Sequence, residues 1–365
     1  MNKNAMSRPS RRRFLSVATA AAASTVARLG ASPFPAVTPG EVRRLKSPGF
    51  LDLQVNGFAG VDFNDPATTV DELHRAIGVL RSHGVTRLLP TLITSSAERF
   101  DQCARLVLQV KTDAFAGIHM EGPYISPEDG ARGAHPREFT APASIEDFKR
   151  RQDAASGHIR LVTLAPEVPG AIPLIEYLRA NGIRVAIGHT AASAEVVRDA
   201  IKAGATLSTH LGNGAAQMIP RHPNFIWEQL AADEMMASLI VDGHHLPPAT
   251  VKTMIRAKGV RRTILVTDAI AAAGQPPGEY QLGSVKVRLD ETGRVAVPGA
   301  PNLAGSALAM DRAVANTVRF AGVPLEDALA MASTNPAAYL GVKTAGTLHL
   351  EWDPEAFALR VEKVA

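Results

Sequence analysis

Apolar segments alternate with amphipathic segments through most of the chain. Eight short segments are almost continuously apolar, which is typical of strands in a parallel sheet because both faces of such strands are buried. These segments are Phe50–Val55, Val85–Thr91, Ala116–Glu121, Ile159–Pro166, Arg184–His189, Ala205–His210, Met236–Asp242 and Thr263–Asp268. Apolar residues at helical spacing lie between them, at Val70–His83, Glu98–Lys111, Ala171–Asn181, Ala194–Gly204 and Pro248–Lys258. This alternation predicts an α/β fold, a closed (β/α)8 TIM barrel rather than an open sheet.

The segments outside these units complete the predicted organisation. Tyr280–Pro298 alternates apolar and polar residues around Asp-Glu-Thr-Gly, which predicts a β-hairpin inserted after the eighth strand. Leu308–Ala321 and Leu325–Ser333 have the pattern of closing helices. We therefore expect a leader at 1–36, a linker with a candidate β strand at 37–48, the barrel at 49–341 with the hairpin insertion at 279–300, and a reduced β appendage that ends with 342–365.

Basic residues are concentrated near the start of the chain. The 365 residues have a formal net charge of +4, but residues 1–40 contain six Lys or Arg and no acidic residue. The remainder has 33 basic and 35 acidic residues, a formal charge of −2. Together with an aromatic content of 5%, this charge argues against a nucleic-acid-binding function for the folded part.

The leader has the features of an export signal. Ser10-Arg-Arg-Arg-Phe-Leu-Ser16 precedes a short, alanine-rich apolar segment at 17–26, and this arrangement resembles a twin-arginine signal. The apolar segment is shorter than the roughly 20 residues that span a membrane. We expect export to the periplasm, with no stable membrane span after signal removal; if the signal is not used, the protein stays in the cytoplasm.

Polar residues end most of the predicted strands. Barrel active sites collect at the carboxyl ends of the strands, so these residues are expected to converge. They are Gln54, Asn56, Thr91, His119, Glu121, Glu167, His189, His210, Asp242, His245 and Asp268. One carboxylate and two imidazoles from separate strands, Glu121, His189 and His210, suit a single divalent cation. The one cysteine, Cys103, excludes an internal disulfide and a cysteine-based zinc site.

Asp268 is the candidate general base. It ends the eighth predicted strand, in Val266-Thr-Asp-Ala269. From there its carboxylate could take a proton from a metal-activated water and deliver it to a leaving amine. A single histidine near an apolar segment is more often a hydrogen-bonded core residue, and a single acid at a strand end is often a helix cap. Six of the eight apolar strands end in polar residues. Burying polar residues is unfavourable in itself, so their presence there favours a function, that of a metal-dependent hydrolase.

Eight motifs occur in the order found in one enzyme family. They are Pro48-Gly-Phe-Leu-Asp-Leu-Gln-Val-Asn-Gly57, His119-Met-Glu-Gly-Pro123, Gly188-His-Thr190, Thr209-His-Leu211, Asp242-Gly-His-His245, Val266-Thr-Asp-Ala269, Leu303-Ala-Gly-Ser306 and Thr334-Asn-Pro-Ala337. Together they resemble the N-acetylglucosamine-6-phosphate deacetylases of the amidohydrolase superfamily, over residues 47–341. The resemblance implies a metal-dependent barrel that hydrolyses the N-acetyl amide of N-acetylglucosamine 6-phosphate, or of a closely related N-acetyl amino sugar.

The same resemblance implies roles for individual residues. The implied metal ligands are Glu121, His189 and His210. The implied catalytic acid and base is Asp268, and the residue implied to polarise the acetyl carbonyl is His135. The implied substrate contacts are Ala134, His135, Asn213, Gly214, Arg221, His245, Leu303, Ala304 and Gly305, with Arg221 and His245 at the phosphate. Gln54 and Asn56 are further candidate pocket residues of the first strand.

The first strand predicts how many ions are bound. Many amidohydrolases have His-x-His there, which anchors a second ion, whereas this chain has Gln54-Val55-Asn56. Neutral amides are poor ligands for transition metals, so we expect one divalent ion. Zn2+ is the first expectation, and Fe2+, Co2+ and Mn2+ suit the same donors.

Two features leave the substrate open. The family usually has an aromatic residue and a methionine in the loop that is Thr209-His-Leu-Gly-Asn-Gly-Ala-Ala-Gln217 here, which changes the wall of the sugar pocket. Sugar 6-phosphates are scarce outside the inner membrane, so the alternatives are an unphosphorylated N-acetyl sugar or another N-acyl substrate. A non-catalytic sugar-binding barrel is a remote alternative, because Asp268 and the three ligands are all present. The resemblance further implies a homodimer.

Overall fold

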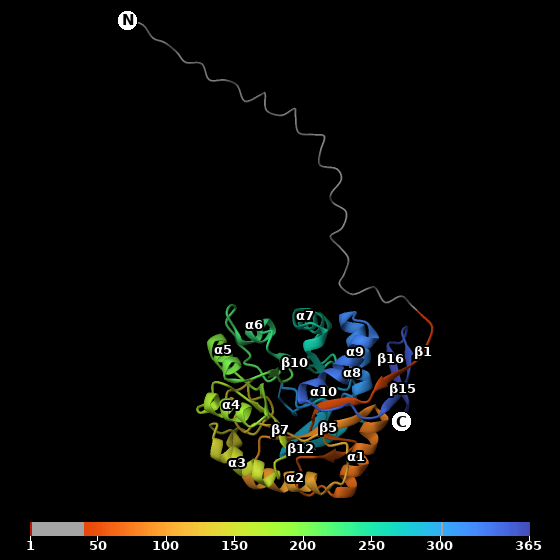
Figure 1. Ribbon diagram of the computed structural model, residues 1–365, viewed down its shortest axis with the longest axis horizontal. Coiled ribbons are helices and arrows are strands. Elements are labelled where there is room, and N and C mark those ends of the chain that lie inside the picture. Colours follow the sequence, from red (N-terminus) through yellow and green to blue (C-terminus); the bar gives the residue numbers. More distant parts are fainter. Residues whose placement is uncertain (2–39, 301) are drawn as a thin grey trace. The chain divides into compact units, whose positions relative to one another are not determined.

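The computed structural model describes Met1, residues 40–300 and residues 302–365 (Figure 1). The predicted leader, apart from Met1, and the first three residues of the predicted linker lie in the range 2–39, outside the described residues. None of the helices among the described residues is long and apolar enough to cross a membrane.

An eight-stranded parallel sheet forms the centre of the described part of the chain, in the order β11-β10-β9-β8-β7-β6-β5-β2. Its strands are β2 (Phe50–Val55), β5 (Val85–Ile93), β6 (Ile118–Glu121), β7 (Ile159–Leu164), β8 (Arg184–Ile187), β9 (Leu207–Ser208), β10 (Met236–Leu239) and β11 (Thr263–Leu265). Nearly every residue of these strands is buried, because side chains fill the inside of the barrel and helices cover the outside. The predicted (β/α)8 barrel is therefore confirmed.

Helices follow the strands around the barrel. They are α1 (Val70–Ser82), α2 (Ala97–Gln109), α3 (Ile145–Ala154), α4 (Ala171–Ala180), α5 (Ala194–Ala203), α6 (Phe225–Ala231), α7 (Pro248–Lys258), α8 (Met310–Ala321), α9 (Leu325–Ala332) and α10 (Thr334–Leu340), with 3-10 turns at Arg137–Phe139 and Val260–Arg262. Several begin at a side chain that accepts a backbone N–H of the first turn. Thr69 forms a capping box with Glu72, and Ser96, Ser144 and Ser193 each cap one helix.

Antiparallel sheets flank the barrel. The strands β1 (Arg43–Pro48), β15 (Thr347–Asp353) and β16 (Ala358–Val364) form one sheet, in which residues 43–48 lie beside residues 347–352 (Figure 1). A second sheet contains β12 (Gly278–Leu282), β13 (Val285–Leu289) and β14 (Val295–Ala296), and a short ribbon contains β3 (Gly57–Phe58) and β4 (Val61–Asp62). The expected hairpin corresponds to β13 and β14, and β12 adds a third strand that the alternation did not indicate.

The barrel closes where its first strand meets the segment after its last strand. Val55 and Ala269 form a parallel bridge, and the N–H of Asp268 donates to the carbonyl of Gln54 at 3.0 Å. Deeper in the barrel, the buried Asp52 accepts hydrogen bonds from the hydroxyl and the N–H of Thr267. We call this contact between residues 52–56 and 267–269 the seam; it brings two predicted site residues together.

Five strands end two to three residues earlier than the hydrophobic pattern predicts. The predicted strands through Pro166, His189, His210, Asp242 and Asp268 end at Leu164, Ile187, Ser208, Leu239 and Leu265. In three of them the cause is the backbone of the site residue itself. His189, His210 and Asp268 have φ angles of 51°, 31° and 50°, so the chain turns out of the sheet there.

Candidate functional site

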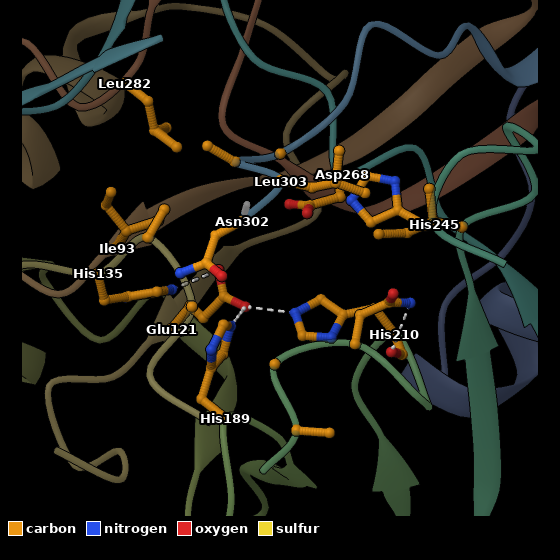
Figure 2. Close-up of a pocket in the computed structure, with 18 of the residues that line it drawn as sticks. Ile93, Glu121, His135, His189, His210, His245, Asp268, Leu282, Asn302 and Leu303 are labelled. Atoms are coloured by element: carbon orange, nitrogen blue, oxygen red, sulfur yellow. Dashed lines mark hydrogen bonds and ion pairs between the residues drawn. The ribbon is translucent and has the colours of Figure 1, made fainter. Parts of the chain in front are cut away.

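Glu121, His189 and His210 meet above the carboxyl ends of their strands, and all three are buried. The Nε2 atoms of His189 and His210 lie 3.2 Å and 3.1 Å from the same Glu121 oxygen, Oε1 (Figure 2). One ligand atom from each residue lies within 4.8 Å of the others. Ligands at about 2.0–2.2 Å from one ion have this spacing, so the donor set fits a single divalent cation.

The surroundings of His189 orient its ring toward the ion position. Its Nδ1 lies 3.1 Å from the carbonyl oxygen of Ala131. A carbonyl oxygen only accepts, so Nδ1 carries the hydrogen and Nε2 keeps its lone pair for a metal. Gly214 packs against the same ring with φ of +54°, and a Cβ there would lie 2.6 Å from His189 Nδ1. Glycine at position 214 therefore allows the loop 209–217 to pack closely against the ring of His189.

The pKa values follow from the clustering of charge in a buried site. Burial alone would raise the pKa of Glu121, but hydrogen bonds from His189 and His210 bring it well below its usual range. Burial likewise opposes the charged form of His210, and the Glu121 carboxylate outweighs it and raises the pKa of that imidazole. Glu121 is therefore an anion in this site, as a metal ligand must be.

Asp268 lies beside this cluster, held from one side by the first strand. The Nδ2 of Asn56 donates to its Oδ1 at 2.7 Å. Burial and the negative charge of Glu121 raise the pKa of Asp268 to about 6, against the lowering effects of His210 and His245. A carboxylate with a raised pKa can both take and return a proton near neutral pH, which suits a general base that later acts as an acid.

The first strand also contacts Glu121, the candidate metal ligand. Gln54 donates from Nε2 to Glu121 Oε1 at 2.9 Å, but it lies outside the pocket lining. Each amide of the first strand thus binds one functional carboxylate, Gln54 that of Glu121 and Asn56 that of Asp268.

A cavity of about 240 Å³ opens onto these groups. It brings together most of the residues implied by the sequence motifs: Asn56, Glu121, Ala134, His135, His189, His210, Asn213, Gly214, His245, Asp268, Leu303, Ala304 and Gly305. In Figure 2, His135 and Ile93 lie on one side of the cavity, and Asp268 and His245 lie on the other. Arg221 is the exception besides Gln54, because it is exposed and does not line the cavity.

Two histidines of the pocket differ in what holds them. His135 is buried, with Nε2 4.0 Å from Glu121 Oε2, and burial followed by the charge of His189 lowers its pKa to about 3. It is therefore neutral at physiological pH. His245 is held by Asp242, whose Oδ2 lies 2.7 Å from Nδ1 and whose Oδ1 accepts the N–H groups of residues 244 and 245.

The other polar strand ends have structural partners. Glu167 accepts from the Thr190 hydroxyl and the Ala191 N–H, both at 2.6 Å, and so fixes the loop after His189. His119 is fully buried below the cavity, where its Nε2 lies 2.7 Å from the hydroxyl of Thr163. Burial lowers the pKa of His119 to about 4, so it remains a neutral core residue.

Several lining residues carried no sequence signal. They include Ile93, Ile240, Leu282 and Asn302. Leu282 comes from the inserted sheet and packs with Ile93 in an apolar cluster against one wall of the cavity. A hydrophobic residue in an alternating strand is expected to be buried somewhere, and only the position of the insertion shows that it borders the site.

Comparison with known proteins agrees with this geometry. The chain matches the amidohydrolase family over residues 45–359. It is 34% identical to the N-acetylglucosamine-6-phosphate deacetylase of Lysinibacillus sphaericus, over 85% of this chain and 80% of that protein. It is equally similar, at 34% identity over 85% of this chain and 82% of the relative, to the N-acetylgalactosamine-6-phosphate deacetylase of Escherichia coli O157:H7.

A solved structure shows the same architecture. The N-acetyl-D-glucosamine-6-phosphate deacetylase of Mycobacterium smegmatis, crystallised as an aspartate-to-alanine variant with N-acetyl-D-glucosamine-6-phosphate, superimposes with a TM-score of 0.80. The two sequences are 32% identical, and the match covers 88% of this chain and 85% of that chain.

Proposed function

The chain belongs to the amidohydrolase family, and from this premise we propose that it removes the acetyl group of N-acetylglucosamine 6-phosphate, giving acetate and the free amino sugar phosphate. One observation carries the proposal: Glu121, His189 and His210 meet around one point of a cavity that Asp268 also lines. This combination of a divalent-cation site and a carboxylate with a raised pKa is what hydrolysis of an unactivated amide requires.

The ion would be held by Glu121 Oε1 and by Nε2 of each histidine. A divalent ion there supplies Lewis acidity, which polarises the acetyl carbonyl and lowers the pKa of water from about 15.7 toward 7. Zn2+ is the ion we propose, because imidazole and carboxylate donors suit it; Fe2+, Co2+ and Mn2+ suit the same donors.

The protein's own groups complete the reaction. Asp268 takes a proton from the attacking water and returns it to the amide nitrogen, so that the amine leaves in its neutral form. His135 is neutral and lines the same cavity, from where its Nε2–H donates to the acetyl carbonyl oxygen as negative charge develops there. Ile93 and Leu282 offer an apolar wall to the acetyl methyl group.

The sugar phosphate would bind on the opposite side, where His245 lies. Asn213, Gly214 and the segment 303–305 also line the cavity and would contact the sugar. Arg221 is exposed and does not line the cavity of its own chain. We propose a homodimer, in which a second copy would be needed to bring an Arg221 to a phosphate.

The position of Arg221 also favours a second candidate, the same hydrolysis of an unphosphorylated N-acetyl sugar. Without Arg221, there is no Lys or Arg among the described residues that line the cavity, which leaves His245 as the group proposed to bind the phosphate. Export by a twin-arginine signal, which we propose for residues 1–36, would place the enzyme where such sugars are available.

Acetate release from four compounds tests these proposals. The zinc-loaded full chain is incubated with N-acetylglucosamine, its 6-phosphate, N-acetylgalactosamine 6-phosphate and an N-acetyl amino acid. We expect the highest kcat/KM with N-acetylglucosamine 6-phosphate. Equal rates with and without the phosphate would favour the second candidate, and preference for the galacto epimer would reassign the sugar. No acetate from any compound would contradict the proposed chemistry.

A further inference from the structure

Asn56 is fixed in place by the seam. Its backbone N–H donates to the carbonyl of Ala269 at 2.8 Å, and its own carbonyl accepts the N–H of Phe63 at 2.9 Å. Its side chain lines the cavity although the residue is only 1% exposed. The side chain therefore has little freedom to turn away from the site.

The two ends of the Asn56 amide have different partners. A carboxylate oxygen accepts hydrogen bonds, so the contact of 2.7 Å with Asp268 Oδ1 requires the donor end, Nδ2. That leaves Oδ1 as the free end. Oδ1 is buried and accepts no hydrogen bond from any of the described residues. A buried acceptor without a partner is destabilising, so a donor from a bound ligand would be stabilising there.

The position of this free oxygen indicates which donor it meets. The oxygen and nitrogen of one carboxamide are about 2.3 Å apart, so Asn56 Oδ1 lies within about 5 Å of Asp268 Oδ1. Asp268 must reach the amide nitrogen of the substrate to protonate it. Two acceptors this close together can contact the same nitrogen.

The geometry of a secondary amide also directs the substrate N–H toward Asn56. Its N–H is trans to its carbonyl. With the carbonyl directed at the ion position and His135, the N–H points toward the opposite side of the cavity, where Asp268 lies (Figure 2). Asn56 Oδ1, within about 5 Å of Asp268 Oδ1, is a free acceptor near that carboxylate.

We propose that Asn56 Oδ1 accepts the hydrogen of the substrate's amide nitrogen, and that Asn56 thereby selects amides over esters. The inference rests on the proposed function and adds a specificity-determining residue to it. While Nδ2 holds one oxygen of Asp268, Oδ1 holds the nitrogen to which that carboxylate delivers its proton. Both contacts come from one rigid planar group.

A pair of unreactive ligands tests this contact without any chemical step. In both, a tetrahedral methylphosphonyl group replaces the acetyl group on the sugar 6-phosphate; it is bridged to C2 by N–H in one and by oxygen in the other. Dissociation constants are measured by calorimetry on the zinc-loaded full chain, on Asn56→Ala and on the near-isosteric Asn56→Leu. Asn213→Ala, which removes another asparagine side chain from the cavity, is the matched control.

We expect the wild type to bind the N–H ligand about 10- to 100-fold more tightly than the oxygen ligand, since one acceptor would otherwise stay unpaired. In both Asn56 variants this ratio should fall below about threefold, whereas Asn213→Ala should keep it. A ratio that is unchanged in Asn56→Ala and Asn56→Leu overturns the inference, whatever happens to the absolute affinities. A wild type that releases acetate but prefers neither ligand also overturns it. A wild type that releases no acetate and binds neither ligand overturns the proposed function as well.

Discussion

Gln54 Nε2 donates a hydrogen bond of 2.9 Å to Glu121 Oε1, the carboxylate oxygen that His189 and His210 also approach. The amide thus lies next to the ion position without offering it a good ligand atom. Asn56, two residues further along, is bound to Asp268. Both amides thus hydrogen-bond to carboxylates, which supports the proposal that the site binds one ion.

Gln54→Ala should keep one ion per chain and bind it more weakly. Groups that orient a metal ligand typically change metal affinity by about 10- to 100-fold. We expect a loss of about tenfold, measured by competition with a chromophoric chelator. An unchanged affinity, or a second bound ion in the wild type, would contradict this account of the first strand.

Asp268→Asn should separate metal binding from catalysis. The variant keeps the size of the side chain but cannot accept the proton of the attacking water. We expect kcat for acetate release to fall by about 10²- to 10⁴-fold, with the zinc content unchanged. A kcat within threefold of the wild type would remove Asp268 from the mechanism.

Asp242→Asn should affect phosphate binding through His245. Asp242 is partly buried, and burial would raise its pKa, but hydrogen bonds from His245 and the backbone lower the pKa below its ordinary value. Without the carboxylate, the imidazole loses the group that orients it. We expect KM for the phosphorylated sugar to rise about tenfold with little change in kcat.

The chain offers a matched control for this substitution. Asp311 pairs with His83 at 2.9 Å, and neither residue lines the active-site cavity. Asp311→Asn should leave KM unchanged. An equal rise in KM for the unphosphorylated sugar in Asp242→Asn would show that His245 does not read the phosphate.

Asp52→Asn should change how the stability of the protein depends on pH. Burial raises the pKa of Asp52 to about 7, against hydrogen bonds from Thr267 and Gln54. In the unfolded chain this carboxyl ionises near pH 4, so its contribution to stability is full below that pH and is lost as the pH rises to about 7. An asparagine has no such loss.

The measurement is the free energy of unfolding by urea at pH 5 and pH 8. Between these pH values, Asp52→Asn should gain about 2 kcal/mol relative to the wild type. Asp199→Asn, at an exposed position, should show no such gain. A difference between Asp52→Asn and the wild type that is the same at both pH values would contradict the raised pKa.

The eight strands could be predicted because burial on both faces leaves continuous apolar segments, and the polar residues after them were visible against that background. The strand ends could not. His189, His210 and Asp268 leave the sheet through positive φ angles. His and Asp adopt such angles more often than most other residues, but still too rarely for the sequence to indicate them.

Other features could not be predicted from the sequence because they depend on contacts between distant parts of the chain or on short elements. Closure of the barrel joins residues 54–56 to 267–269, more than 200 residues apart, and so creates the contact between Asn56 and Asp268. Motif order implied that Arg221 belongs to the phosphate site, but the loop after β9 leaves it exposed and outside the cavity. Helices α6 and α10 are each 7 residues long, too short for the spacing of apolar residues to stand out. Helix α3 is as long as the predicted α4, but Phe148 is its one buried apolar residue, so it lacks a clear apolar face.

Titration of metal-free protein with Zn2+ tests whether acetate release depends on one ion bound per chain. Acetate release from N-acetylglucosamine 6-phosphate is followed as zinc is added to the full chain at a concentration well above the dissociation constant. We expect the rate of acetate release to rise linearly until one ion is bound per chain. In a His189→Ala, His210→Ala double variant the rate should not rise at the same zinc concentrations. A rise that continues to two ions, acetate release without any ion, or no release at full zinc loading would contradict this expectation.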